Sequence, residues 1–122
     1  MEKVVVVPLD GSEMSFKALT FAISIAEAFG DALHLVHVKQ DESEAEDIFN
    51  RANTVIEQTN LTYTTKVREG IPSIEIADEA KEQEARLIVM GSLGMNPQVS
   101  VALGSVSQRV LPLAPCPVTF VS

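Results

Sequence analysis

Residues 87–105 read LIVMGSLGMNPQVSVALGS, an apolar run followed by a segment that holds three of the six glycines of the chain. The apolar run predicts a buried strand at Arg86–Met90. Glycine weakens regular structure, so glycines gathered in one segment mark a backbone that bends sharply or lies close to another group. We therefore expect the chain to leave a sheet here and to continue into a helix at Gly104–Leu111.

Outward from this segment, short apolar runs alternate with stretches of helical periodicity. Strands are predicted at Lys3–Leu9, Ala32–Val38, Leu61–Arg68 and Val118–Val121, and helices at 13–29, 45–56 and 72–84. Strands that alternate with helices pair in parallel through right-handed crossovers. The predicted fold class is α/β, an open doubly wound five-stranded parallel sheet with helices on both faces. Residues 1–122 are expected to form one such domain.

The place of a ligand site follows from this topology. Open parallel sheets bind ligands beyond the carboxyl ends of their strands, at the point where the strand order reverses. The two most apolar strands, at 3–9 and 86–90, are expected to be central neighbours. Asp10 would then face the glycine-rich segment. An Asp-Gly pair also forms ordinary turns, but its predicted position favours contact with a ligand.

The glycine-rich segment has the chemistry of a phosphate site. Gly91 and Gly94 would let main-chain N–H groups converge on a ligand oxygen without a Cβ between them. Gly104 opens a helix, whose first N–H groups favour an anion, and Ser105 and Ser107 add hydroxyl donors. On spacing alone, an alternative stays open: the glycines only turn the chain and cap a helix.

Longer segments carry a resemblance to a known family. These segments are VVVVPLDGS (4–12), LVHV (35–38), GIPSIEIADEA (70–80), LIVMGSLG (87–94) and LGSVSQRVLPLAPCPVTFV (103–121). Together they resemble the universal stress protein family, and the pattern G-x2-G-x9-G-[ST] resembles the signature of its ATP-binding branch. The resemblance implies the strand order 3-2-1-4-5 and homodimers joined through the last strand, Val118–Val121.

The resemblance also implies which residues bind the nucleotide. Asp10 matches the aspartate that contacts the nucleoside, and Val38 matches the residue that touches adenine through its backbone. Pro8 and Leu9 match residues at the same end of the first strand. The positions implied to hold ribose and phosphates are Gly91, Gly94, Gly104 and Ser105, with Val106 and Ser107 beside them.

Charge and composition exclude several other classes of function. The net charge of −8 opposes binding to nucleic acids and to anionic membranes. No apolar run is long enough to span a bilayer, and the first residues do not resemble a signal peptide. The single cysteine, Cys116, fits a reducing compartment, so we expect a cytoplasmic protein.

The remaining chemically active residues suggest no catalytic or metal centre. His34 and His37 are three apart on a strand, so they should point to opposite faces and pack within the sheet. Cys116 has no basic neighbour in sequence and is expected to be a buried small residue. No catalytic triad can be argued from the order of residues. Asp10 could help hold Mg²⁺ through water or phosphate.

The leading functional hypothesis is an adenine-nucleotide-binding stress-response protein that acts as a nucleotide-dependent regulatory homodimer. A slow ATP hydrolase and a structural dimerisation module with an empty cleft are the alternatives. No Lys or Arg lies between Gly91 and Gly104, so a bound triphosphate should depend on Mg²⁺, unless Arg109 or a second subunit supplies the charge. If the last strand joins the subunits, Thr119→Pro should disrupt the dimer and leave a folded domain. The protein partner is not specified by the sequence.

Overall fold

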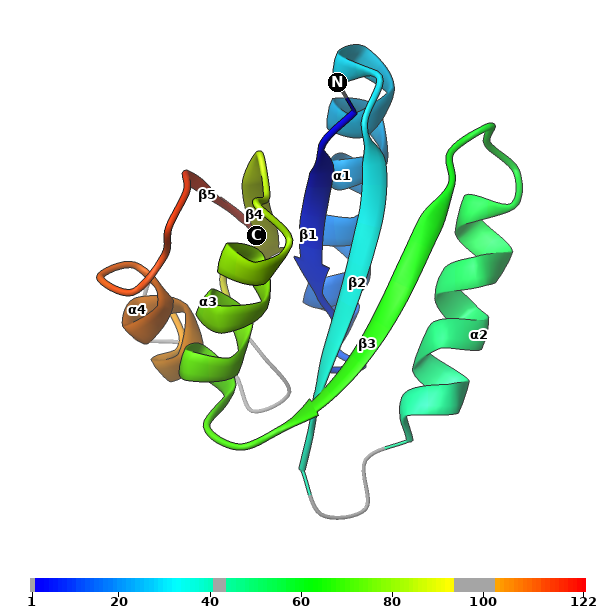
Figure 1. Ribbon diagram of the computed structural model, residues 1–122. Coiled ribbons are helices and arrows are strands. Elements are labelled where there is room, and N and C mark those ends of the chain that lie inside the picture. Colours follow the sequence, from blue (N-terminus) through cyan, green and yellow to red (C-terminus); the bar gives the residue numbers. More distant parts are fainter. Residues whose placement is uncertain (1, 41–43, 94–102) are drawn as a thin grey trace.

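A computed structural model describes residues 2–40, 44–93 and 103–122. The elements are β1 (Val4–Pro8), α1 (Glu13–Phe29), β2 (Ala32–Lys39), α2 (Ala45–Ile56), β3 (Tyr63–Glu69), α3 (Pro72–Glu82), β4 (Leu87–Gly91), α4 (Ser105–Val110) and β5 (Val118–Val121). Figure 1 shows a twisted sheet with helices packed on both of its faces.

The sheet has five parallel strands in the order β3-β2-β1-β4-β5, as predicted. From β1 the chain moves outward through β2 to β3, and then crosses back to β4 on the other side of β1. The order therefore reverses between β1 and β4, which lie side by side near the centre with Val5 paired to Leu87. The carboxyl ends of these two strands define the switch point of the sheet.

Alternation along the central strands produces two hydrophobic layers. On β1, the side chains of Val5 and Val7 pack with residues of α1 and α2, whereas Val6 packs with residues of α3 and α4. All three side chains are fully buried. A strand covered on both faces reads as a continuous apolar run, which is why VVVV at 4–7 forms the centre of the sheet.

The turn after β1 is held by local hydrogen bonds. Gly11 adopts a φ of 91°, a conformation that favours glycine. Ser12 caps α1 by accepting a hydrogen bond from the N–H of Ser15 at 3.1 Å. This cap fixes where α1 begins and so fixes the path of the loop that carries Asp10.

Two predicted boundaries were wrong by two residues. The helix α3 ends at Glu82 and not at Glu84, because Glu84 has a φ of 49° and the chain turns there. The strand β3 begins at Tyr63 and not at Leu61, because the N–H of Leu61 donates to the hydroxyl of Thr59 within a local turn. Both differences arise from turns whose geometry depends on neighbouring elements.

The two edge strands differ in length and in burial. β3 has seven residues, and the side chains from Thr64 to Val67 are exposed. β5 has four residues, all of them half-buried. β3 also carries the charged residues Lys66 and Arg68, whereas β5 carries no charge.

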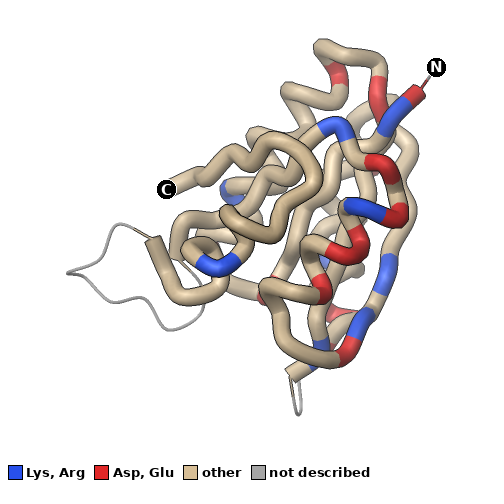
Figure 2. Tube along the Cα trace, turned by 60° about the vertical axis from the view of Figure 1, so that its left-hand side comes forward, with Lys and Arg blue, Asp and Glu red and all other residues tan. Residues whose placement is uncertain are grey.

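A polar cluster lies between β2, β3 and α3. We call His34, Thr64, Arg68 and Glu79 the Glu79 cluster. His34 and Glu79 are buried, and their side chains meet with Nε2 and Oε2 2.6 Å apart. The other His34 nitrogen lies 2.5 Å from the Thr64 hydroxyl, and Arg68 donates to Oε1 of Glu79 at 2.6 Å. Figure 2 shows acidic positions on α3 beside basic positions on the neighbouring strand β3.

Candidate functional site

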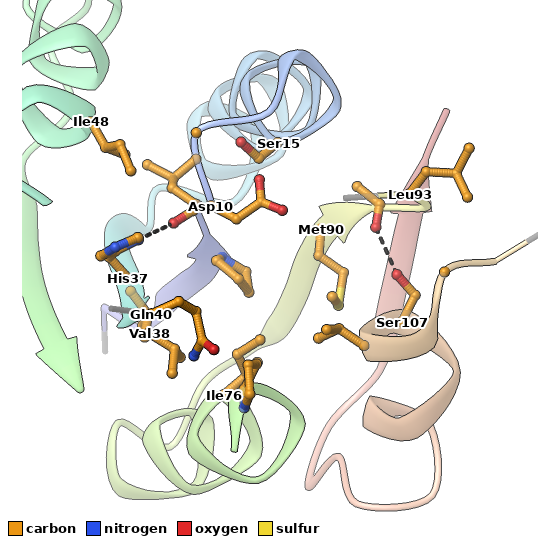
Figure 3. A pocket seen from close by; sticks show the side chains of 18 of the residues that line it. Asp10, Ser15, His37, Val38, Gln40, Ile48, Ile76, Met90, Leu93 and Ser107 are labelled. Carbon is orange, nitrogen blue, oxygen red and sulfur yellow. Dashed lines mark hydrogen bonds between the residues drawn. The ribbon is translucent and has the colours of Figure 1, made fainter. Parts of the chain in front are cut away.

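A pocket of about 1090 Å³ opens at the carboxyl ends of β1, β2 and β4. This volume is large enough for a nucleotide, since ligand pockets in proteins span roughly 300–1,000 Å³. Figure 3 shows Asp10 inside this pocket, with Ile48 of α2, Ile76 of α3 and Ser107 of α4 around it. The pocket thus occupies the switch point between β1 and β4.

The structure brings together every described residue that the sequence marked for this site. The lining includes Pro8, Leu9, Asp10, Val38, Gly91, Gly104, Ser105, Val106 and Ser107. The tenth residue of that set, Gly94, lies outside the described residues. Segments from both halves of the chain therefore meet around one cavity.

Asp10 is exposed at the start of the loop after β1. One carboxylate oxygen, Oδ1, accepts a hydrogen bond from the N–H of Ser12 at 2.9 Å. This bond fixes the orientation of the side chain and directs its carboxylate to the pocket (Figure 3). The two interpretations of Asp10, as a turn residue and as a residue that contacts a ligand, are thus compatible, because the turn positions the carboxylate.

Gly91 explains part of the glycine pattern by packing. A Cβ at this position would lie 2.9 Å from Cγ of Met14 and 3.1 Å from the main-chain carbonyl carbon of Met14. The close group is therefore the first turn of α1, which packs directly onto the end of β4. Gly91 is required by this helix contact, independently of any ligand.

Two other groups that were expected to face a ligand donate hydrogen bonds to main-chain carbonyl groups of the protein itself. The hydroxyl of Ser107 donates to the carbonyl oxygen of Gly91 at 2.9 Å, and Ser107 is buried. The N–H of Gly104 donates to the carbonyl oxygen of Ser92 at 2.7 Å. These two bonds fasten α4 to the end of β4. Ser105, in contrast, is exposed in the lining of the pocket.

Sequence reasoning missed the wall that α2 and α3 contribute. Ile48 and Ile76 supply apolar surface, and Arg51 adds a basic group. The guanidinium of Arg51 lies over the Phe16 ring, 3.9 Å from its centre, and pairs with Glu13 at 2.8 Å. Isoleucines at helical spacing normally signal core packing, so only the tertiary structure shows that these two also line a pocket.

The charges around the pocket have both signs. The acidic residues in the lining are Asp10, Glu44 and Asp47, and the basic residues are Arg51 and Arg109. A hydrogen bond with Asp47 and its negative charge raise the pKa of Glu44. Arg109 lies in the last turn of α4, and the structure places it in the lining even though it follows Gly104 by more than one turn.

The histidines point to opposite faces, as expected from their spacing. His34 belongs to the Glu79 cluster on the α3 side, whereas the His37 ring packs edge-on against Phe49 of α2. The described residues contain no group of three or more His, Cys, Asp or Glu side chains that could hold a metal ion. Cys116 is half-buried, and this burial raises the pKa of its thiol. A raised pKa opposes thiolate reactivity.

In the described part of the chain, no helix is both long enough and apolar enough to cross a membrane.

Comparisons with known proteins agree on one family. The sequence model of the universal stress protein family matches residues 1–122. A universal stress protein of Methanocaldococcus jannaschii is 30% identical in a match that covers 98% of this chain and 81% of that protein. The universal stress protein UspA of Lactobacillus plantarum has a TM-score of 0.89 and 28% identity, over 98% of this chain and 97% of that one. A universal stress protein solved in complex with cAMP has a TM-score of 0.78 and 26% identity, over 98% and 97% of the two chains. The chain belongs to the universal stress protein family.

Proposed function

We propose that the pocket at the β1/β4 switch point binds an adenine nucleotide and that the protein acts as a nucleotide-dependent regulator in stress responses. The observation that carries this proposal is the convergence of Asp10, Val38, Gly91 and the start of α4 on one cavity. These residues come from segments far apart in the sequence. Packing accounts for Gly91, but it does not require Asp10 and Ser105 to be exposed in the lining of a pocket.

The neighbour solved with cAMP supports the choice of an adenine nucleotide. The pocket also offers chemistry suited to each part of such a ligand. Apolar side chains, among them Ile76 and Met90, suit the base, and the Asp10 carboxylate suits the hydroxyl groups of ribose. Ser105 and Arg109 lie on the α4 side, where they suit phosphate.

Replacement of Asp10 tests the site directly. Asp10→Asn keeps an oxygen that can accept the Ser12 N–H bond, so the turn should persist. We expect it to weaken AMP binding about tenfold, because a charged acceptor of ribose hydroxyls is lost. Isothermal titration calorimetry measures this change. Glu44→Gln, at the acidic rim of the same pocket, is the matched control and should leave the affinity within about twofold.

Two outcomes would contradict the proposal. Wild-type protein that binds none of AMP, ADP, ATP or cAMP, and that releases no nucleotide when denatured, would exclude nucleotide binding. Equal affinities of wild type and Asp10→Asn would remove Asp10 from the site.

The charge balance of the pocket predicts how metal affects binding. Arg51 is already paired with Glu13, and three carboxylates line the same cavity, so a triphosphate meets an unfavourable field. We expect ATP affinity to rise at least about tenfold with Mg²⁺ relative to EDTA, while AMP affinity changes less than about twofold. Metal-free ATP that binds more tightly than AMP would contradict this prediction. Arg109→Ala would then show whether Arg109 supplies the charge.

We also propose a homodimer joined through β5. This strand forms one edge of the sheet, and an edge strand offers unpaired main-chain groups to another chain. The carbonyl oxygens of Pro117 and Val121 accept hydrogen bonds from Ile88 and Ser92, so odd-numbered residues face β4. Because the directions of main-chain N–H and C=O groups alternate along a strand, Val118 and Phe120 direct these groups away from β4, to the outer edge of the sheet.

Because of this register, a mutation other than Thr119→Pro is needed to test the dimer. The N–H of Thr119 lies on the β4 side, so Thr119→Pro would damage the sheet itself and not its outer edge. Phe120→Pro removes an outward donor, and Phe120→Ala is its control because both variants lose the ring. We expect Phe120→Pro to raise the dimer dissociation constant at least about tenfold over Phe120→Ala in analytical ultracentrifugation. Equal dimerisation of the two variants would contradict the interface.

A further inference from the structure

The strand β2 presents different main-chain groups to its two neighbours. The N–H of Leu33 donates to Thr62, just before β3, and the N–H of Ala32 donates to Lys3, just before β1. Odd-numbered residues of β2 therefore bond towards β3, and even-numbered residues bond towards β1. Val38 is even-numbered, so its N–H and C=O are directed to the side of β1.

At Val38, however, β1 has already ended. The pairing of β1 with β2 stops at Pro8 opposite Val36, and the N–H of Leu9 makes one further bond to the Val36 carbonyl at 2.8 Å. Continuation of the ladder would pair the carbonyl of Leu9 with the N–H of Val38. No such bond joins these two groups in the described structure.

The side chain of His37 takes that position. Its Nδ1 lies 2.7 Å from the carbonyl oxygen of Leu9 (Figure 3). A carbonyl oxygen can only accept a hydrogen bond, so Nδ1 carries the hydrogen. The imidazole thus supplies one donor to the carbonyl that the main chain of Val38 would otherwise bond, and so lowers the gain from a second bond to this oxygen. The ring is held in place by burial, with 2% of the residue exposed, and by its edge-on contact with Phe49.

We propose that His37 is a positioning residue, which occupies the carbonyl of Leu9 and thereby keeps the main-chain edge of Val38 open for an adenine base. This inference rests on the proposed function for its ligand, but its structural part concerns the protein alone. Val38 lines the pocket, and its directed N–H and C=O match the ring acceptor and the amino donor on the adenine edge. Hypoxanthine, the base of IMP, presents the reverse order, a ring donor and a carbonyl acceptor.

Without His37, the Leu9 carbonyl would lack its donor, and the N–H of Val38 is the group best placed to replace it. Extending the ladder in this way would close the edge that adenine needs. The mechanism predicts a competition in which the Val38 amide bonds either to a ligand or to Leu9, and the donor of His37 shifts this competition towards the ligand.

A matched pair of variants tests this mechanism. His37→Asn keeps an N–H donor at the same distance from the main chain, whereas His37→Leu has a similar shape and no donor. Hydrogen exchange of the Val38 amide, followed by NMR without nucleotide, gives the first measurement. In the wild type this amide should exchange at least about tenfold faster than that of Val36, which lies within the ladder. His37→Leu should remove most of the difference, and His37→Asn should preserve it.

Equal protection of Val36 and Val38 in the wild type would overturn the proposal, whether or not His37→Leu folds. Unchanged exchange at Val38 in a folded His37→Leu variant would overturn it as well. Neither result depends on nucleotide binding, so the proposed function can fail separately.

Titration with AMP and IMP gives the second measurement. The wild type should prefer AMP by at least about tenfold, His37→Leu should lose most of that preference, and His37→Asn should retain it. A general weakening of the fold would lower both affinities together and leave their ratio unchanged. If His37→Leu keeps the wild-type ratio, His37 does not position the adenine edge.

Discussion

Replacement of Glu79 by alanine is expected to lower the free energy of unfolding by about 3–5 kcal/mol, the usual cost of removing one partner from a buried ion pair. Glu79 is 2% exposed and joins His34 and Arg68 across α3, β2 and β3. Its loss leaves Nε2 of the buried His34 without its partner. Chemical denaturation monitored by circular dichroism measures the change.

Glu82→Ala is the matched control for this prediction. Glu82 also pairs with Arg68, at 2.7 Å, but 63% of its side chain is exposed. Water competes for such a pair, so we expect Glu82→Ala to cost less than about 1 kcal/mol. If both variants lower the free energy of unfolding equally, burial of Glu79 does not account for the stability that its ion pairs provide.

The pH dependence of stability offers an independent check on Glu79. Burial by itself would raise its pKa, but the hydrogen bonds from Arg68 and His34 outweigh burial, and the pKa is lowered from its ordinary 4.5. A group with a lowered pKa in the folded state stabilises the protein above the unfolded value, about 4.5 here. This stabilisation disappears as the pH falls through the lowered value. The difference in the free energy of unfolding between wild type and Glu79→Gln should therefore shrink as the pH falls below about 4.5 and through the lowered pKa of Glu79.

Gly91→Val is expected to destabilise the protein by about 3 kcal/mol, because it forces extra methyl groups into a packed contact. The nearest atoms belong to Met14, and one of them, at 3.1 Å, is main chain that cannot rotate away. The expected consequence is a displacement of α1 from the end of β4. Thermal and chemical denaturation of the purified variant measure the loss.

A double-mutant cycle with Met14→Ala separates the two parts of this effect. Cγ of Met14, 2.9 Å from the added Cβ, is removed in that background, whereas Cβ and the main-chain contact remain. We expect Met14→Ala to recover about 1 kcal/mol of the cost of Gly91→Val, which is within the range measured for contacting residues. Additive costs would mean that the Met14 side chain beyond Cβ takes no part in the clash.

The glycine pattern shows how far sequence reasoning reached. The predicted close approach of the backbone is present at Gly91, the last residue of β4. At Gly91 the approaching group is the first turn of α1, more than seventy residues earlier in the chain. Local sequence shows that space is needed at such a position, but only packing shows which group fills it.

The strand order and the central position of β1 and β4 followed from apolar runs and from the family resemblance. The roles of individual polar groups did not follow. Ser107 has the same hydroxyl as Ser105, but one is buried against Gly91 and the other is exposed in the pocket. His37 was expected only to pack, whereas its ring donates to the end of the neighbouring strand. Such roles depend on distances between elements, which residue spacing along one element does not contain.

The unequal edges of the sheet bear on how far self-association can proceed. A sheet whose two edges both accept further strands can add copies without end and form a filament. Here β3 presents exposed charged side chains, Lys66 among them, a feature that discourages strand addition at an edge. The short uncharged β5 lacks this feature. If β5 pairs with its own copy, as proposed, the arrangement is closed and two-fold, and growth should stop at two subunits.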